Sequence, residues 1–140
     1  LIEEEKLGLA NEQTYKSVYQ KVKDYKISLR KLIDEEKSKN GKLIGLGAPA
    51  RGVVIMNYVN INSDDLEYII DDTSLKQDKF APGVHIPVKS IEILKNEKEK
   101  KTFFLLSWNY KESFVKRLKE IMPSFRMIIP FPQLKVEEFW

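Results

Sequence analysis

The chain has 140 residues, the length of one average domain, and its composition of 42% hydrophobic and 32% charged residues excludes a disordered polyelectrolyte. Its 24 Lys and Arg residues only slightly outnumber its 21 Asp and Glu residues, so charge gives no indication of nucleic-acid binding. The absence of Cys excludes disulfides and zinc–thiolate clusters, the single His disfavours a histidine-based metal site or triad, and no apolar run reaches the ~20 residues that cross a bilayer.

The first eight residues, LIEEEKLG, are acidic and lack the basic-then-apolar pattern of a signal peptide. Together with the absence of Cys, this predicts a soluble cytoplasmic protein without membrane contact. Because the chain begins with Leu1 rather than Met, we expect it to be a piece of something larger, with part of the parent's chemistry outside these residues.

A long amphipathic helix is predicted from Asn11 to about Lys39. Asn11 or Thr14 can cap its start, and Asn40-Gly41 ends it. Charged residues on the opposite face are interleaved in sign, which indicates a solvated surface. We therefore expect residues 1–40 to form a helical segment that packs on the sheet or on a neighbouring domain. Its apolar residues recur at steps of three and four and form one stripe, Tyr15, Val18, Tyr19, Val22, Tyr25, Leu29, Leu32 and Ile33.

Short apolar runs and helices alternate through the rest of the chain. Strands are predicted at residues 42–46, 66–70, 103–106 and 127–129, and helices at 50–59, 88–94 and 111–121. Strands that are apolar on both faces and separated by helices imply a mostly parallel sheet with helices on both faces. The prediction is an α/β fold, a Rossmann-like three-layer sandwich over residues 41–140, in a chain that is a single domain overall.

The segment GLGAPA at residues 45–50 follows the first predicted strand and satisfies the G-x-G-x-x-[GA] pattern of a dinucleotide-binding fold. We expect Gly45 to permit the tight turn, Gly47 to let a ligand approach the backbone, and Ala50 to allow close packing of helix on strand. Asp71 follows at the end of the next predicted strand, where such folds carry a ribose-binding acid.

Two neighbours of this turn bear on an anionic ligand. Pro49 lacks an N–H where a phosphate would need one, which argues against the simplest dinucleotide site. Arg51 adds positive charge beside the start of the helix, which itself offers free N–H groups. The pattern leaves two alternatives open, an NAD(P)-binding Rossmann domain of an oxidoreductase and a turn that merely connects strand to helix.

Three further segments end at the same edge of the predicted sheet. DDTSLKQ at residues 71–77, continuing to FAPGVHIP at 80–87, leaves the second strand, SWNY at 107–110 follows the third, and PFP at 130–132 follows the last. Such loops at the carboxyl ends of parallel strands host ligands. We therefore expect a ligand site at this edge.

His85 and the aromatic residues of these loops have two interpretations each. His85, the only imidazole, can exchange a proton near pH 7, but a loop histidine next to proline is more often a structural hydrogen-bonder. Trp108 and Tyr110 can stack on a base or sugar with Asn109 supplying amide hydrogen bonds, whereas Trp108 can equally fill the core with Asn109 as a helix cap.

In their order along the chain, GLGAPARG, DDTSLKQ with FAPGVHIP, SWNY and PFP resemble the C-terminal domain of the sugar C-methyltransferase family. The resemblance runs from about Lys42 to Pro132, and the preceding long helix also fits the family. It implies a zinc-binding N-terminal domain and a middle domain for S-adenosylmethionine, both upstream of this chain, and a Rossmann-like C-terminal domain that helps hold a nucleotide-linked keto-deoxysugar. Two positions depart from the family pattern, Asp78 where Gly is usual and Val84 where Thr or Ser is usual.

The resemblance further implies methyl transfer to a ring carbon, after a base removes the proton next to the sugar's keto group. His85 is the only plausible base here, so we expect the isolated domain to be inert, with no metal or cofactor of its own. Its expected partners are the nucleotide-sugar and the upstream methyltransferase domain, and a nucleotide-sensing module is a further alternative. The candidate substrate-binding residues are Gly45, Gly47, Ala48, Pro49, Ala50, Arg51, Asp71, Lys76, Gln77, Pro82, Gly83, His85, Trp108, Asn109, Tyr110 and Pro130.

Within this set, a diphosphate of charge about −2 would be bound by the helix start together with Arg51 and Lys76. Trp108, Asn109 and Tyr110 would contact the nucleoside or the sugar ring. We therefore expect the cations to supply affinity and the aromatic segment to supply selectivity.

Overall fold

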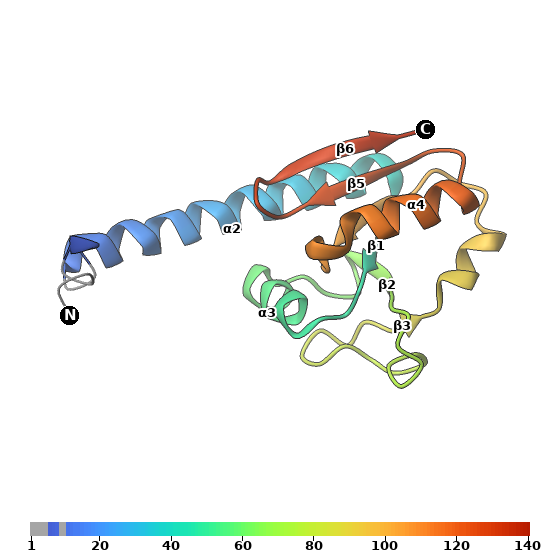
Figure 1. Ribbon diagram of the computed structural model, residues 1–140, viewed down its shortest axis with the longest axis horizontal. Helices are drawn as coiled ribbons and strands as arrows, with labels where there is room; N and C mark the ends of the chain where they lie inside the picture. Colours follow the sequence, from blue (N-terminus) through green and yellow to red (C-terminus); the bar gives the residue numbers. More distant parts are fainter. Residues whose placement is uncertain (1–5, 9–10) are drawn as a thin grey trace.

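A six-stranded sheet in the order β3-β2-β1-β4-β5-β6 forms the centre of the computed structural model, which describes residues 6–8 and 11–140 (Figure 1). All neighbouring strands are parallel except β5 and β6, which are antiparallel. This is the strand order of dinucleotide-binding folds, and it confirms the predicted α/β class. The strands are β1 (Leu43–Leu46), β2 (Leu66–Ile70), β3 (Val88–Lys89), β4 (Thr102–Leu105), β5 (Phe125–Ile129) and β6 (Lys135–Phe139).

Three α-helices lie close to their predicted bounds, α2 (Glu12–Asn40), α3 (Ala50–Val59) and α4 (Lys111–Ile121). The Asn11 side chain accepts a hydrogen bond from the Gln13 N–H at the start of α2, and Gly41 ends the helix with φ 74°. Two 3₁₀ helices are also present, η1 (Ile91–Asn96) and η2 (Trp108–Tyr110). None of the helices in the described part of the chain is both long and apolar enough to span a membrane.

The helix predicted at 88–94 is wrong over its first two residues, whereas residues 91–94 lie in the 3₁₀ helix η1. The Ile69 N–H donates to the Pro87 carbonyl and the Asp71 N–H to the Lys89 carbonyl, so this segment becomes the edge strand β3 before η1 begins. Its helical apolar spacing is overridden by these long-range pairings with β2. Strand β6, in which charged residues outnumber apolar ones, also has no local signal and forms by pairing with β5.

Helices cover both faces of the sheet, as predicted. Leu29 of α2 and Met56 of α3 share one core with alternate strand residues such as Phe104. Leu118 of α4 and Leu94 of η1 share the other core with the intervening strand residues. In this arrangement the carboxyl end of β1 points toward the space between α3 and α4 (Figure 1).

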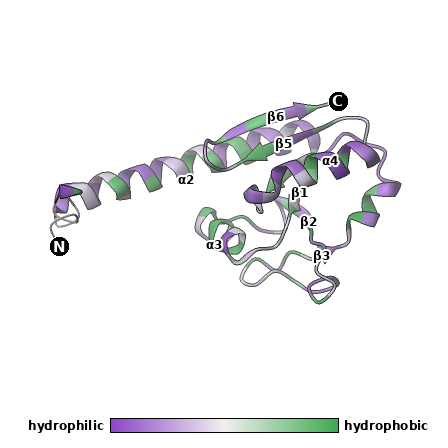
Figure 2. Cartoon of the chain, in the orientation of Figure 1, coloured by the Kyte–Doolittle hydropathy of each residue, from purple (hydrophilic) through white to green (hydrophobic). Residues whose placement is uncertain are grey.

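The apolar stripe of α2 is divided into two parts. Leu29 and Ile33 are fully buried against the sheet, whereas the first half of the helix extends beyond the rest of the fold (Figure 1). The exposed stripe, defined here as Tyr15, Val18, Tyr19 and Val22, is between 43% and 61% exposed. Figure 2 shows hydrophobic bands recurring along this projecting half.

Two buried carboxylates fix the other half of α2. Arg30 donates two hydrogen bonds to Asp65, of 2.7 and 2.8 Å, and Lys37 donates a third of 2.9 Å. Burial alone would raise the pKa of Asp65, but these hydrogen bonds outweigh it and lower the pKa to about 2. Glu36 is held in the same way by Arg126 of β5.

Candidate functional site

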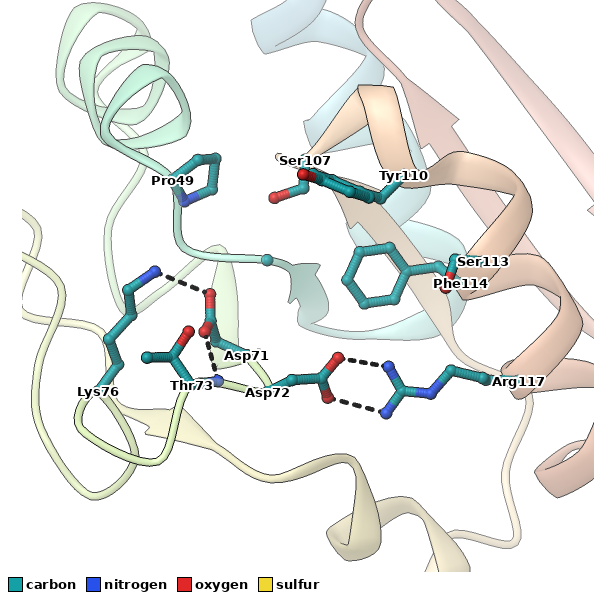
Figure 3. A pocket seen from close by; sticks show the side chains of 11 residues that line it. Pro49, Asp71, Asp72, Thr73, Lys76, Ser107, Tyr110, Ser113, Phe114 and Arg117 are labelled. Carbon is teal, nitrogen blue, oxygen red and sulfur yellow. Dashed lines mark hydrogen bonds and ion pairs between the residues drawn. The ribbon is translucent and has the colours of Figure 1, made fainter.

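A pocket of about 370 Å³ opens at the carboxyl ends of β1, β2 and β4, between α3 and α4 (Figure 3). Strand β1 has β2 on one side and β4 on the other, so the pocket lies where the strand order reverses, the usual ligand site of such sheets. We call it the switch-point pocket. Its lining residues are Gly47, Pro49, Asp71, Asp72, Thr73, Lys76, Ser107, Tyr110, Ser113, Phe114 and Arg117.

The glycines of the turn have different roles from those predicted. Gly45 lies inside β1, where a Cβ would be 2.9 Å from Cγ1 of Ile69, so it serves sheet packing and not the turn. Gly47 makes the turn, with φ 80°. A Cβ on Gly47 would lie 2.0 Å from Oγ of Ser107, so the close approach at this glycine is made by the protein's own side chain.

Close packing of α3 on the sheet depends on Gly52 and not on Ala50. Ala50 is exposed, whereas a Cβ on the buried Gly52 would lie 2.9 Å from Cβ of Leu106. Gly52, the last glycine of GLGAPARG, therefore allows the close packing of helix on strand that the G-x-G-x-x-[GA] pattern assigns to Ala50. Gly52 is not among the predicted residues because that pattern ends two residues earlier.

The Asp71 carboxylate is buried and accepts hydrogen bonds from the protein itself. Asp71 is 7% exposed, and its carboxylate accepts hydrogen bonds from the N–H groups of Ala48 (2.7 Å) and Thr73 (2.9 Å) and from Nζ of Lys76 (3.2 Å). Burial would raise the pKa of Asp71, but the hydrogen bonds from Thr73, Ala48 and Lys76 outweigh it and lower the pKa. With these donors in place Asp71 is not an open acceptor for a ribose hydroxyl, and the NAD(P) alternative loses its main support.

The two cations of the switch-point pocket are each paired with a carboxylate. Lys76 contacts Asp71 and also donates to the Ala48 carbonyl at 3.0 Å, while Arg117 makes a two-pronged pair with Asp72. Figure 3 shows these pairs on opposite sides of the pocket floor. The pocket is therefore balanced in charge, which favours an uncharged polar group as its occupant.

Arg117 and its helical neighbours Ser113 and Phe114 were not among the predicted site residues. Tyr110, Ser113, Phe114 and Arg117 follow one another at helical spacing and so share one face of α4 and its preceding turn. That spacing, on a helix that starts at the predicted ligand edge, is the signal that could have found them.

Arg51 lies at the end of an aromatic stack. Its guanidinium carbon is 4.8 Å from the ring centroid of Trp108, which lies 4.9 Å from Phe131, whose ring is 5.2 Å from that of Tyr25. The Tyr25 hydroxyl donates to the carbonyl of the buried Pro130 at 3.0 Å. Arg51 is exposed, and no carboxylate of the described residues pairs with it. The stack holds a cation beside the start of α3.

The remaining predicted residues lie outside the switch-point pocket. The Gln77 side-chain amide donates to the Asp71 backbone carbonyl at 2.9 Å and so stabilises the loop that follows β2. A Cβ on Gly83 would meet Asn57 of α3 at 2.4 Å. The His85 ring stacks on Phe80 at 4.1 Å, and Asn109 is exposed on η2. Ala48, Ala50 and Pro82 line a second hollow, of about 320 Å³.

The two departures from the family pattern have clear local environments. Asp78 has φ 59°, the left-handed region that glycine adopts most easily, and its carboxylate pairs with Nζ of Lys89 at 2.8 Å. Val84 is buried with 8% exposure in the core beneath α3. Neither side chain lines the switch-point pocket.

The chemistry available in the switch-point pocket is that of binding. The hydroxyls of Ser107, Tyr110 and Ser113 have no hydrogen-bond partner among the described residues, so each can donate to and accept from a ligand. The rings of Tyr110 and Phe114 add apolar surface. Across residues 6–8 and 11–140, no group of three or more acidic or histidine side chains could hold a metal ion.

Comparisons with known proteins place the chain in a family. Residues 1–132 match the family described as the C-methyltransferase C-terminal domain, a match that includes α2. The chain is also similar to C-methyltransferase NovU of Streptomyces niveus, at 28% identity over 137 residues, which cover 97% of this chain and 32% of that protein. The chain thus spans about a third of the length of this curated relative.

Proposed function

Because the chain belongs to the family of C-methyltransferase C-terminal domains, we propose that it is the substrate-side domain of a methyltransferase that acts on a nucleotide-linked keto-deoxysugar. The main support is the switch-point pocket at the carboxyl edge of a parallel sheet, which is balanced in charge and has three hydroxyls without a hydrogen-bond partner among the described residues. A sugar or nucleoside ring, which is uncharged and rich in hydrogen-bonding groups, fits this chemistry.

The diphosphate of such a ligand would lie over the start of α3. The first N–H groups of α3 have no partner within the helix, and Pro49 provides no side-chain cap. Arg51 is the adjacent cation without a carboxylate partner among the described residues, whereas Lys76 already contacts Asp71. Arg51 therefore contributes more to phosphate affinity than Lys76 does.

The methyl-transfer step itself would depend on the rest of the enzyme. S-adenosylmethionine would supply the methyl group when bound by an upstream domain, and zinc would belong to a further upstream domain. His85, the only candidate base of the chain, stacks on Phe80 and does not line the switch-point pocket. This chain would bind and orient the sugar nucleotide, and the 140-residue domain alone would not methylate it.

The upstream methyltransferase domain would dock on the exposed stripe of α2. Tyr15, Val18, Tyr19 and Val22 continue the same face that packs on the sheet further along the helix. An apolar stripe that is covered over only half of its helix offers the uncovered half to a partner.

Calorimetry on the 140-residue chain tests this function. A keto-deoxysugar nucleotide should bind, and NADH and S-adenosylmethionine should not. Replacing Arg51 by Ala should weaken sugar-nucleotide binding roughly ten- to a hundredfold, with a loss that shrinks as salt rises. Its Tm should stay within a few degrees of the parent, because the side chain is exposed.

Lys98→Ala is the matched control. It removes the same charge from the exposed turn before β4, at the opposite edge of the sheet, and should leave affinity unchanged. Binding of NADH without binding of any sugar nucleotide would favour an oxidoreductase domain instead. An absence of binding to every nucleotide tested would leave the turn a purely structural element.

A further inference from the structure

The second hollow lies next to the switch-point pocket, across the start of α3. Lys76 lines both cavities, and its Nζ is 3.0 Å from the carbonyl of Ala48, in the turn before α3. Pro49 lines the switch-point pocket, and its neighbour Ala50 lines the second hollow. A ligand with two ends and a short linker can therefore enter both cavities by crossing the first turn of α3.

The two cavities differ in chemistry. The switch-point pocket contains hydroxyls and two ion pairs. The second hollow is lined mainly by apolar side chains, with no carboxylate and with Lys79 joining Lys76. Leu75 and Phe80 line it while remaining 77% and 53% exposed, so this apolar surface is open to a ligand.

One face of the Phe80 ring is stacked on another ring. It stacks on His85 with the two ring planes 6° apart, and the Phe80 backbone forms an isolated bridge with Pro87. A flat aromatic side chain at an apolar hollow is a favourable surface for a heteroaromatic ring, and a neighbouring lysine favours a phosphate attached to that ring.

We propose that the second hollow binds the nucleobase of the sugar nucleotide, the sugar ring occupies the switch-point pocket, and the diphosphate crosses the start of α3 between Arg51 and Lys76. This assignment rests on the proposed function and orients its ligand. The chemistry of the two cavities determines which end of the ligand enters which cavity. The second hollow is apolar and takes the base, and the switch-point pocket is rich in hydroxyls and balanced in charge and takes the sugar. The assignment gives a role in nucleotide recognition to Leu75, Lys79 and Phe80, which were not among the predicted site residues.

Fragment titrations of the ¹⁵N-labelled 140-residue chain, followed by amide chemical shifts, test this orientation. A pyrimidine nucleoside 5′-monophosphate should shift the amides of Leu75, Lys79 and Phe80. Inorganic pyrophosphate should shift the amides at Ala50 and Arg51. The complete sugar nucleotide should shift all of these and, in addition, the amides that line the switch-point pocket.

Two substitutions should separate the two ends of the ligand. Leu75→Gln should weaken both the monophosphate and the sugar nucleotide about five- to tenfold, because it removes most of one apolar contact. Tyr110→Ser should weaken the sugar nucleotide and leave the monophosphate unchanged. Val54→Gln is the matched control, because Val54 is an exposed apolar residue of α3 that lines neither cavity, and it should change neither affinity.

The opposite pattern would overturn the orientation while leaving the proposed function intact. In that case the monophosphate would shift the amides of Ser107 and Tyr110, and Leu75→Gln would have no effect on its affinity. If no sugar nucleotide perturbed any amide at either cavity, the proposed function would fail, and this inference with it.

Discussion

Removing one partner of the buried ion pair between α2 and the sheet should destabilise the fold strongly, because it leaves a buried charge without its partner. Glu36 is 1% exposed and accepts hydrogen bonds of 2.7 and 2.9 Å from Arg126 and one of 3.1 Å from Lys39. Arg126→Met keeps the long apolar stem and removes the charge. The carboxylate is then left with Lys39, and with the Thr102 hydroxyl at 3.4 Å.

Removing one partner of a buried ion pair lowers the free energy of unfolding by ~3–5 kcal/mol. Because Lys39 still contacts Glu36, we expect a loss of about 3 kcal/mol for Arg126→Met. For a chain of this size that corresponds to a fall in Tm of roughly 12 °C, at about 4 °C per kcal/mol. Arg117→Met is the control, because its partner Asp72 is largely exposed and such pairs contribute ~1 kcal/mol or less.

The dependence on pH gives a second test of the same pair. Burial raises the pKa of Glu36, but the hydrogen bonds from Arg126 and Lys39 outweigh it, so the pKa of Glu36 lies below its ordinary value of 4.5. The pair's contribution is therefore present above pH 4.5 and is lost as the pH falls through the lower pKa of the folded state. In Arg126→Met the hydrogen bonds from Arg126 no longer offset the effect of burial, so the pKa of Glu36 should rise. Protonation of Glu36 then removes the buried charge and should reduce the loss of stability.

Urea unfolding followed by circular dichroism at pH 7 and pH 4 measures both effects. The gap in unfolding free energy between Arg126→Met and the parent should narrow at pH 4. Equal losses for Arg126→Met and Arg117→Met at pH 7, or a gap that stays constant between the two pH values, would refute the argument that a buried carboxylate is left without its partner.

Two further sets of substitutions test the turn and the projecting helix. Gly47→Ala should cost more than ~2 kcal/mol in urea unfolding, because its φ of 80° disfavours a side chain and the new Cβ would overlap Ser107. Adding Ser107→Gly removes the side chain that the new Cβ would overlap, so it should restore part of the lost free energy of unfolding. No gain in stability from this second change would contradict the steric explanation. Val18→Gln with Val22→Gln should change stability by less than ~1 kcal/mol but weaken association with the separately purified upstream domain in sedimentation measurements. A larger loss of stability would mean that these residues pack within this chain.

Local periodicity determined most of the secondary structure. The bounds of α2, α3 and α4 follow from apolar spacing, and those of α2 also from its caps, because a helix is stabilised by contacts three and four residues apart that the sequence displays directly. The apolar runs likewise marked β1, β2, β4 and β5 and the parallel sheet. The ordered motifs also identified the family, since each of them is contiguous in the chain.

Contacts between distant residues decided what the sequence could not. Asp71 matches the pattern of a ribose-binding acid, yet the fold places Ala48 and Lys76 on its carboxylate. The segment 88–94 has helical apolar spacing, yet its first two residues form strand β3 by pairing with β2. The first half of α2 has the same apolar pattern as the second half without any sheet beneath it. A pattern of residue types indicates which groups are available. Which of them meet depends on distances in three dimensions, and only the tertiary structure fixes these.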